Sequence, residues 1–168
     1  SRILMFLGVY TSFFNKDITV ENIGENIGKE LCKLGYSSFS VIGICVGSVV
    51  ALEIAKYLES NRKVVDNVFI GASLPTKAPR ILGKTINPWS FVNRKYINYF
   101  LEKLGGEQVC FEKVSEKIFR NDTNRFFKYV NKENRINIKG AVILIFGEND
   151  KITLGYSNKA KKWKNYIK

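Results

Sequence analysis

The sequence contains no histidine among its 168 residues. It therefore lacks the imidazole that usually serves as general base for a serine or cysteine nucleophile. Its three cysteines, Cys32, Cys45 and Cys110, stand at unrelated spacings. An odd number of this kind suits neither a disulfide framework nor a metal site and favours a reducing compartment. We therefore expect a cytoplasmic protein with no metal and no cofactor.

Long apolar runs are also absent. No stretch approaches the roughly 20 apolar residues that a membrane span requires, although 45% of the residues are hydrophobic. The segment 3–10 is apolar but short, and it predicts a buried strand rather than a signal peptide. A chain of 168 residues is long enough for one domain with a substantial core.

Acidic side chains are scarce, with 15 against 27 basic ones and a net charge of +12. Such a balance favours an acidic partner, which could be nucleic acid, an anionic membrane or an acidic protein. No zinc-finger spacing, aromatic RNA-recognition strand or basic recognition helix accompanies the charge, so we expect no nucleic-acid partner. The densest lysine cluster, at 159–164, is expected to be the solvated face of a terminal helix.

Strand and helix patterns alternate along most of the chain. The periodicity predicts strands at 2–10, 39–44, 64–71 and 141–146. It predicts helices at 19–34 and 46–59 and a final helix near the C-terminus. In the second helix only Glu53, Lys56 and Glu59 mark a polar side, so this helix is expected to pack tightly on the sheet. The alternation predicts an α/β fold with a parallel sheet and right-handed crossovers.

Residues 75–139 have a different composition, rich in Asn, Lys, Phe and Tyr. Helical segments are expected around 91–104 and 112–130, which together predict a helical lid inserted into a single domain 1–168. The aromatic side chains of this lid, among them Trp89, Phe126 and Phe127, are expected to pack among themselves and on the body. A specific cofactor-binding role for them is the alternative.

The segment 43–47, Gly-Ile-Cys-Val-Gly, has the form of a nucleophile elbow with Cys45 at the nucleophile position. An elbow places its nucleophile on a strained turn between a strand and a helix, and the flanking Gly43 and Gly47 let the two elements approach closely. The positive end of the helix dipole favours a thiolate at Cys45. The backbone N–H of Val46 would supply one half of an oxyanion hole.

Asp150 is the second candidate, because it follows the strand at 141–146 and so lies at the same edge of a parallel sheet as the elbow. Aspartate is also an ordinary turn residue, and a turn role for Asp150, with Glu148 and Asn149, stays open. Asp66 precedes its strand, which places it at the wrong end of the sheet.

Several segments in order resemble the α/β-hydrolase thioesterases of polyketide and nonribosomal peptide synthetases, most of all the free-standing type II enzymes. The resembling segments are 43–58 (elbow and following helix), 68–80 (strand and loop before the lid), 104–129 (lid) and 143–163 (acid-bearing strand and following helix). The elbow and the turn 147–150 are the most specific of these.

The resemblance implies an α/β-hydrolase fold and hydrolysis of an acyl thioester on the phosphopantetheine arm of a carrier protein or of CoA. It implies that Cys45 is the nucleophile, Val46 an oxyanion donor and Asp150 the acid that orients a histidine. Because such carrier proteins are acidic, the +12 charge would assist their encounter.

The chain departs from the family pattern at both ends. The family histidine would follow Lys168 and the second oxyanion donor would precede Ser1, so we expect these residues to be part of a longer hydrolase. A histidine-free relative that binds without turnover is the alternative. A cysteine elbow also resembles that of acyltransferases and cyclising release enzymes, in which the acyl group passes to an amine or an alcohol instead of water.

Overall fold

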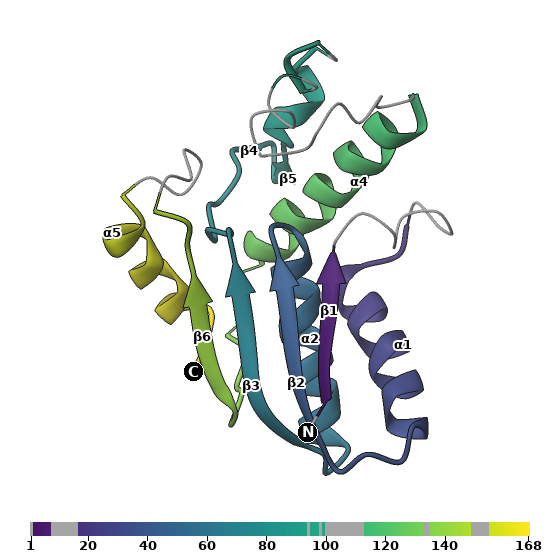
Figure 1. The fold of residues 1–168 in the computed structure, drawn as a ribbon. Helices are drawn as coiled ribbons and strands as arrows, with labels where there is room; N and C mark the ends of the chain where they lie inside the picture. The colour runs from purple at the N-terminus through teal and green to yellow at the C-terminus, as the bar shows by residue number, and fades with distance from the viewer. Residues whose placement is uncertain are drawn as a thin grey trace.

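A computed structural model describes residues 2–7, 17–93, 95–97, 99, 113–132, 135–148 and 155–168. Four parallel strands form its main sheet, in the order β1-β2-β3-β6 (Figure 1). They span Arg2–Leu7 (β1), Ser38–Ile44 (β2), Val64–Gly71 (β3) and Ala141–Ile145 (β6). The predicted parallel sheet is confirmed, and residues 8–10 of the expected first strand lie outside the described residues.

Helix α1, Val20–Lys33, begins at a capping box in which the Thr19 hydroxyl accepts a hydrogen bond from the backbone N–H of Asn22. Its apolar stripe packs against helix α2, Gly47–Ser60. The two helices approach closely at Gly24, where an added Cβ would lie 2.4 Å from the Cβ of Glu53. Gly24 is therefore a contact point between helices.

Helix α2 packs against β1, β2 and β3 and forms the centre of the core. Leu52, Ile54 and Leu58 are fully buried, as expected for a helix that is apolar on several sides. Glu53, one of the three polar residues of this helix, does not face solvent. Its side chain is buried, and it accepts a hydrogen bond from the lid.

Strand β6 lies at one edge of the described sheet. The described residues of the protein bury its apolar side chains only in part. Ile143 and Ile145 are 39% and 47% exposed and alternate with half-buried Val142 and Leu144. Residues on one face of a strand recur with a period of two. The exposed face therefore continues across the sheet to Phe69 of β3, which pairs with Ile143.

The lid lies beyond the C-terminal ends of the strands (Figure 1). It contains the two-stranded hairpin β4 (Arg80–Ile81) and β5 (Lys84–Thr85), the 3-10 turn η2 (Pro88–Phe91) and helix α4 (Lys113–Val130). Helix α4 confirms the segment predicted at 112–130, whereas the hairpin was not predicted. Of the segment predicted at 91–104, residues 95–97 and 99 are helical, and residues 94, 98 and 100–104 lie outside the described part.

The chain ends with α5 (Tyr156–Ala160) and η3 (Lys161–Asn165). Lys161, Lys162 and Lys164 are exposed, as expected for a solvated face, while Trp163 is buried and its indole N–H donates a 3.0 Å hydrogen bond to the carbonyl of Ser73. None of the described helices combines the length and hydropathy that crossing a membrane requires.

Candidate active site

The turn between β2 and α2 holds Cys45 in the left-handed region, with φ at 55°. A residue with a side chain rarely adopts such a φ, and the surrounding structure must impose it. Here the N–H of Cys45 donates to the carbonyl of Gly71 at 2.9 Å, and its carbonyl accepts from the N–H of Ser48 at 3.2 Å. These contacts fix the backbone of Cys45 in the turn between β2 and α2, and its side chain is exposed.

Gly43 lets β2 and α2 approach closely enough for this turn. A Cβ at Gly43 would lie 2.5 Å from the carbonyl oxygen of Gly47 and 2.7 Å from the Cβ of Ala51. The Ser48 hydroxyl also donates to the carbonyl of Gly43 at 3.3 Å. Both elbow glycines therefore lie at the strand–helix contact that the sequence motif indicated.

Val46 is the N-cap of α2, with φ at −63° and ψ at −23°. The first N–H groups of a helix have no partner within the helix, and together they form its positive end. The Cys45 side chain stands beside this end, so a negative charge on its sulfur or on an oxygen bound there is stabilised.

An apolar cavity of about 190 Å³ opens beside Cys45. Three segments line it: the elbow, the loop after β3 and the lid. Its lining residues are Cys45, Val46, Ala72, Ser73, Leu74, Thr76, Trp89, Phe119, Thr123, Phe126 and Phe127. The aromatic residues of the lid thus both pack and line a cavity. The sequence signal for this role was the spacing 119, 123, 126 and 127, which places four side chains on one face of a helix.

The loop after β3 is held in place at the start of its cavity-lining part. Ala72 has a φ of 46°, and its N–H donates to the carbonyl of Ile145 at 3.0 Å. Ser73 is buried and is held through its carbonyl by Trp163. The ends of β2, β3 and β6 are therefore connected by hydrogen bonds beside the cavity.

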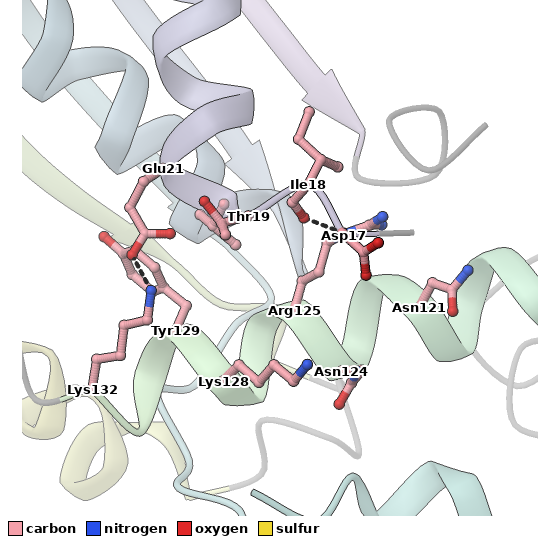
Figure 2. Close-up of a pocket in the computed structure, with 11 residues that line it drawn as sticks. Asp17, Ile18, Thr19, Glu21, Asn121, Asn124, Arg125, Lys128, Tyr129 and Lys132 are labelled. Carbon is pink, nitrogen blue, oxygen red and sulfur yellow. Dashed lines mark hydrogen bonds and ion pairs between the residues drawn. The ribbon is translucent and has the colours of Figure 1, made fainter. Parts of the chain in front are cut away.

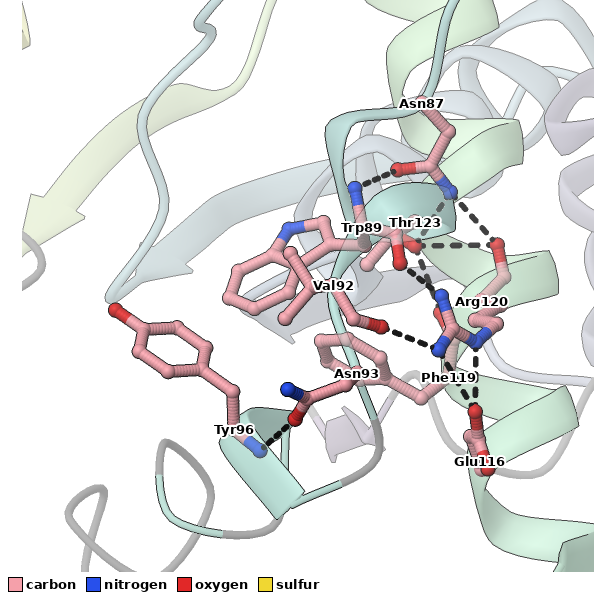
Figure 3. A network of polar contacts seen from close by, with 9 residues as sticks. All are labelled: Asn87, Trp89, Val92, Asn93, Tyr96, Glu116, Phe119, Arg120 and Thr123. Carbon is pink, nitrogen blue, oxygen red and sulfur yellow. Dashed lines mark hydrogen bonds and ion pairs between the residues drawn. The ribbon is translucent and has the colours of Figure 1, made fainter.

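A polar network fixes the far wall of the cavity (Figure 3). The Arg120 guanidinium donates to the carbonyls of Trp89 and Val92 and to the carboxylate of Glu116. The Trp89 ring packs edge-on against Phe119, with ring centroids 5.2 Å apart. Arg120 thus holds the η2 turn on α4 and positions an aromatic pair of the cavity wall.

The Thr123 hydroxyl is the polar group of this wall. It donates to the carbonyl of Phe119 at 2.8 Å and accepts from the side-chain amide of Asn87 at 3.0 Å. Asn87 is itself buried and caps η2 by accepting from the N–H of Trp89 (Figure 3). Because these bonds occupy the hydroxyl, the wall presents mainly carbon to a ligand.

A second, polar hollow of about 240 Å³ lies where α4 crosses the N-terminus of α1 (Figure 2). Buried Arg125 donates to the carbonyl of Ile18 and to the carboxylate of Asp122, each at 2.9 Å. Lys132 donates to Glu21 at 2.6 Å. These contacts fasten α4 to the start of α1.

Two side chains at this crossing have shifted pKa values. Burial raises the pKa of Glu21, but the hydrogen bond and the charge of Lys132, a backbone hydrogen bond and a hydrogen bond from Thr19 together lower it more, so the pKa lies below its ordinary value of 4.5. Burial, together with the negative charge of Glu53, raises the pKa of the Tyr129 hydroxyl well above its ordinary range. Tyr129 therefore stays protonated and donates a hydrogen bond.

Asp150 lies outside the described residues, as does Cys110, so the structure does not test the placement of Asp150 relative to Cys45. The described lining of the cavity contains no carboxylate. Cys32 is half-buried on α1, next to the core. Among the described residues no group of three Cys, Asp or Glu side chains could hold a metal ion.

The arrangement of strands, elbow and lid is that of an α/β-hydrolase fold. Solved structures of this fold include YbtT, a type II thioesterase from the yersiniabactin NRPS/PKS pathway, to which the chain is 14% identical with a TM-score of 0.60. BorB, the type II thioesterase of the borrelidin biosynthetic cluster, is 15% identical with a TM-score of 0.62. A putative α/β hydrolase family protein from Desulfitobacterium hafniense is 16% identical with a TM-score of 0.53.

The match covers 89% of this chain and 61% of YbtT, 89% and 60% for BorB, and 96% and 69% for the Desulfitobacterium protein. The chain thus spans about three fifths of the length of the two thioesterases. No protein-family model and no curated protein matches the sequence. The structural likeness, at these identities, defines the fold.

Proposed function

We propose that the chain belongs to a thioesterase that holds the acyl group of its substrate as a thioester on Cys45. The observation that carries the proposal is the position of Cys45, exposed at a φ of 55° beside an apolar cavity of about 190 Å³. A cysteine with only a structural role in the core would gain nothing from a strained backbone conformation. A nucleophile gains both access and orientation from it.

The first step is a thioester exchange. The Cys45 thiolate attacks the carbonyl carbon of the acyl thioester, and the tetrahedral oxyanion that forms accepts a hydrogen bond from the N–H of Val46. The oxyanion then collapses, the carbon–sulfur bond to the donor breaks, and the donor leaves as a thiolate. One thiolate replaces another, so this step needs no net proton transfer.

The second step is hydrolysis of acyl-Cys45. Water adds to the thioester carbonyl and gives up a proton, and the products are the carboxylic acid and the Cys45 thiol. A general base is needed for this step. In our proposal Asp150 orients that base.

The proposed donors are acyl-phosphopantetheine groups on a carrier protein or on CoA. The lining of the cavity suits an apolar acyl chain, because it carries five aromatic or aliphatic lid and loop side chains, namely Leu74, Trp89, Phe119, Phe126 and Phe127. An engineered apolar cavity of about 150 Å³ holds benzene. The acyl group that fits here is therefore of similar size or slightly larger.

Intact-protein mass spectrometry tests the proposal. The protein is mixed with acyl-pantetheine donors of two to ten carbons, and the mass gain is followed over time. We expect one acyl group per chain in the wild type, with short donors reacting faster than long ones. Cys32→Ala is the matched control and should keep the mass gain, since Cys32 lies on α1.

Cys45→Ala should abolish the mass gain. An equal gain in Cys45→Ala and in the wild type, or no gain with any donor, would reject the proposal. The fate of the acyl group separates the two candidate reactions in the same assay. Loss of the adduct in buffer indicates a hydrolase, whereas loss only after addition of an amine or an alcohol indicates an acyltransferase, which the cysteine nucleophile also favours.

A further inference from the structure

A further open hollow, of about 560 Å³, lies on the outer side of the lid between the β4–β5 hairpin and α4. Its lining residues are Arg80, Lys84, Thr85, Asn124, Lys128 and Lys132. Four of these six side chains are cationic, and none is acidic. We call this surface the basic hollow.

The positive charge of the basic hollow is largely uncompensated. Lys84 and Lys128 are exposed and have no carboxylate partner within the described part of the chain. Arg80 donates to the backbone carbonyl of Asn131, which is a neutral partner. Only Lys132 is paired, with Glu21. Three cations therefore face solvent around one concave surface.

The basic hollow is preformed. Asn131 is buried, and its side chain binds both the N–H and the carbonyl of Ala78, at 3.1 and 3.0 Å. Its amide also donates to the Thr85 hydroxyl at 3.1 Å. One side chain at the end of α4 thus fixes the hairpin, so a partner need not order this surface when it binds.

The basic hollow and the Cys45 cavity lie on opposite sides of α4. Asn124, Lys128 and Lys132 recur every four residues along α4, and they line both the basic hollow and the polar hollow at the N-terminus of α1 (Figure 2). Phe119, Thr123 and Phe126 lie on the cavity side. The two surfaces are therefore separated by one helix, whose diameter is about 10 Å.

We propose that the basic hollow is a docking surface for an acidic protein surface, such as a helix with several carboxylates on one face. All four cations that line the hollow are exposed. A site for a single phosphate would hold converging, buried donors instead. The lining has no aromatic side chain on which a nucleic-acid base could stack. The net charge of +12 adds long-range attraction for such a partner.

Fluorescence anisotropy with two labelled helical peptides tests this inference. One peptide carries Glu on one face, and the other has Gln at the same positions. We expect the Glu peptide alone to bind, and binding to weaken steeply between 50 and 300 mM salt, as roughly expected for exposed charges. The double variant Lys84→Glu/Lys128→Glu should weaken the binding of the Glu peptide about tenfold. Arg80 is left unchanged, because it contacts the backbone of Asn131.

The matched control is Lys162→Glu/Lys164→Glu, which changes net charge equally on exposed side chains of η3. The affinity of this control for the Glu peptide should stay within about twofold of the wild-type value. Equal weakening in both double variants, no binding of the Glu peptide, or tighter binding of an oligo-dT through Lys84 and Lys128 would each overturn the inference. Cys45→Ala should bind the Glu peptide as the wild type does, so the result does not depend on the proposed chemistry.

Discussion

The Tyr129 hydroxyl of α4 donates a 2.7 Å hydrogen bond to the buried carboxylate of Glu53 on α2. This bond joins the lid to the helix that follows the nucleophile elbow. Glu53 also accepts from the Lys56 ammonium at 3.1 Å, so its charge is not isolated. The pair therefore fixes the C-terminal half of α4 on the body of the protein.

Removal of the hydroxyl should destabilise the fold. Tyr129→Phe keeps the ring but leaves a buried carboxylate without one of its donors, which costs about 1–3 kcal/mol. Urea unfolding followed by circular dichroism gives the free energy of unfolding. The control Tyr96→Phe changes a residue that is 55% exposed and should cost less than about 0.5 kcal/mol. Equal effects of the two variants would contradict the role of the pair.

The same hydroxyl should contribute a dependence of stability on alkaline pH. The pKa of Tyr129 is raised in the folded protein by burial and by Glu53, whereas in the unfolded chain it has its ordinary value of 10.0. Above that value the unfolded state binds fewer protons than the folded state, so this group's contribution to stability falls as pH rises. The difference in unfolding free energy between wild type and Tyr129→Phe should therefore shrink from pH 9 to pH 11. A constant difference would contradict the shift.

The carboxylate of Glu21 should contribute a dependence of stability on acidic pH. Burial raises its pKa, and the interactions with Lys132, Thr19 and the backbone together lower it more, so the folded value lies below 4.5. Below about pH 5 the unfolded state binds more protons, and stability is lost as pH falls through the folded pKa. Lys132→Met removes the interactions with Lys132 that lower the folded pKa, so the difference in unfolding free energy between wild type and Lys132→Met should shrink as pH falls from 6 to 3. The control Lys29→Met removes a partner of half-exposed Glu25. It should change the dependence of the unfolding free energy on acidic pH little.

Much of the fold was predictable because its elements carry strong local patterns. The apolar segments of β2, β3 and α2 and the amphipathic stripe of α4 fix strand or helix with little ambiguity. The β4–β5 hairpin was missed, because two-residue strands have no periodicity to detect. It depends on Asn131, which lies 46 residues after Thr85. The burial of Glu53 was not predicted, because its partner Tyr129 is 76 residues away.

The candidate site was predictable in part for the same reason. The local motif around Cys45 was enough to indicate the turn, since both glycines lie within two residues of it. The cavity wall was not predictable, because Trp89 reaches its position through Arg120, 31 residues further along the chain. Long-range polar contacts of this kind leave no periodic signal in the sequence.

The elbow should tolerate no side chain at position 43. In Gly43→Ala the new Cβ would overlap the carbonyl of Gly47 and the Cβ of Ala51, so β2 and α2 must separate. Overpacking of this kind costs about 1–3 kcal/mol or more. The control Gly35→Ala has open space but a φ of 75°, and it should cost about 1 kcal/mol from backbone strain alone. Thermal unfolding separates the two, and a smaller loss at position 43 than at position 35 would contradict the close approach.

Arg120 should control both the stability of the lid and the choice of acyl group. A lysine in Arg120→Lys keeps the charge, but its single ammonium cannot bind Trp89, Val92 and Glu116 at once, so the η2 turn loosens. We expect a loss of about 1–2 kcal/mol in unfolding free energy. Because Trp89 then no longer closes the cavity wall, the ratio of acylation rates for ten-carbon and four-carbon donors should rise severalfold. Lys117→Arg, on the exposed side of α4, is the control and should change neither quantity. An unchanged ratio together with the expected destabilisation would show that Arg120 supports the lid without shaping the cavity.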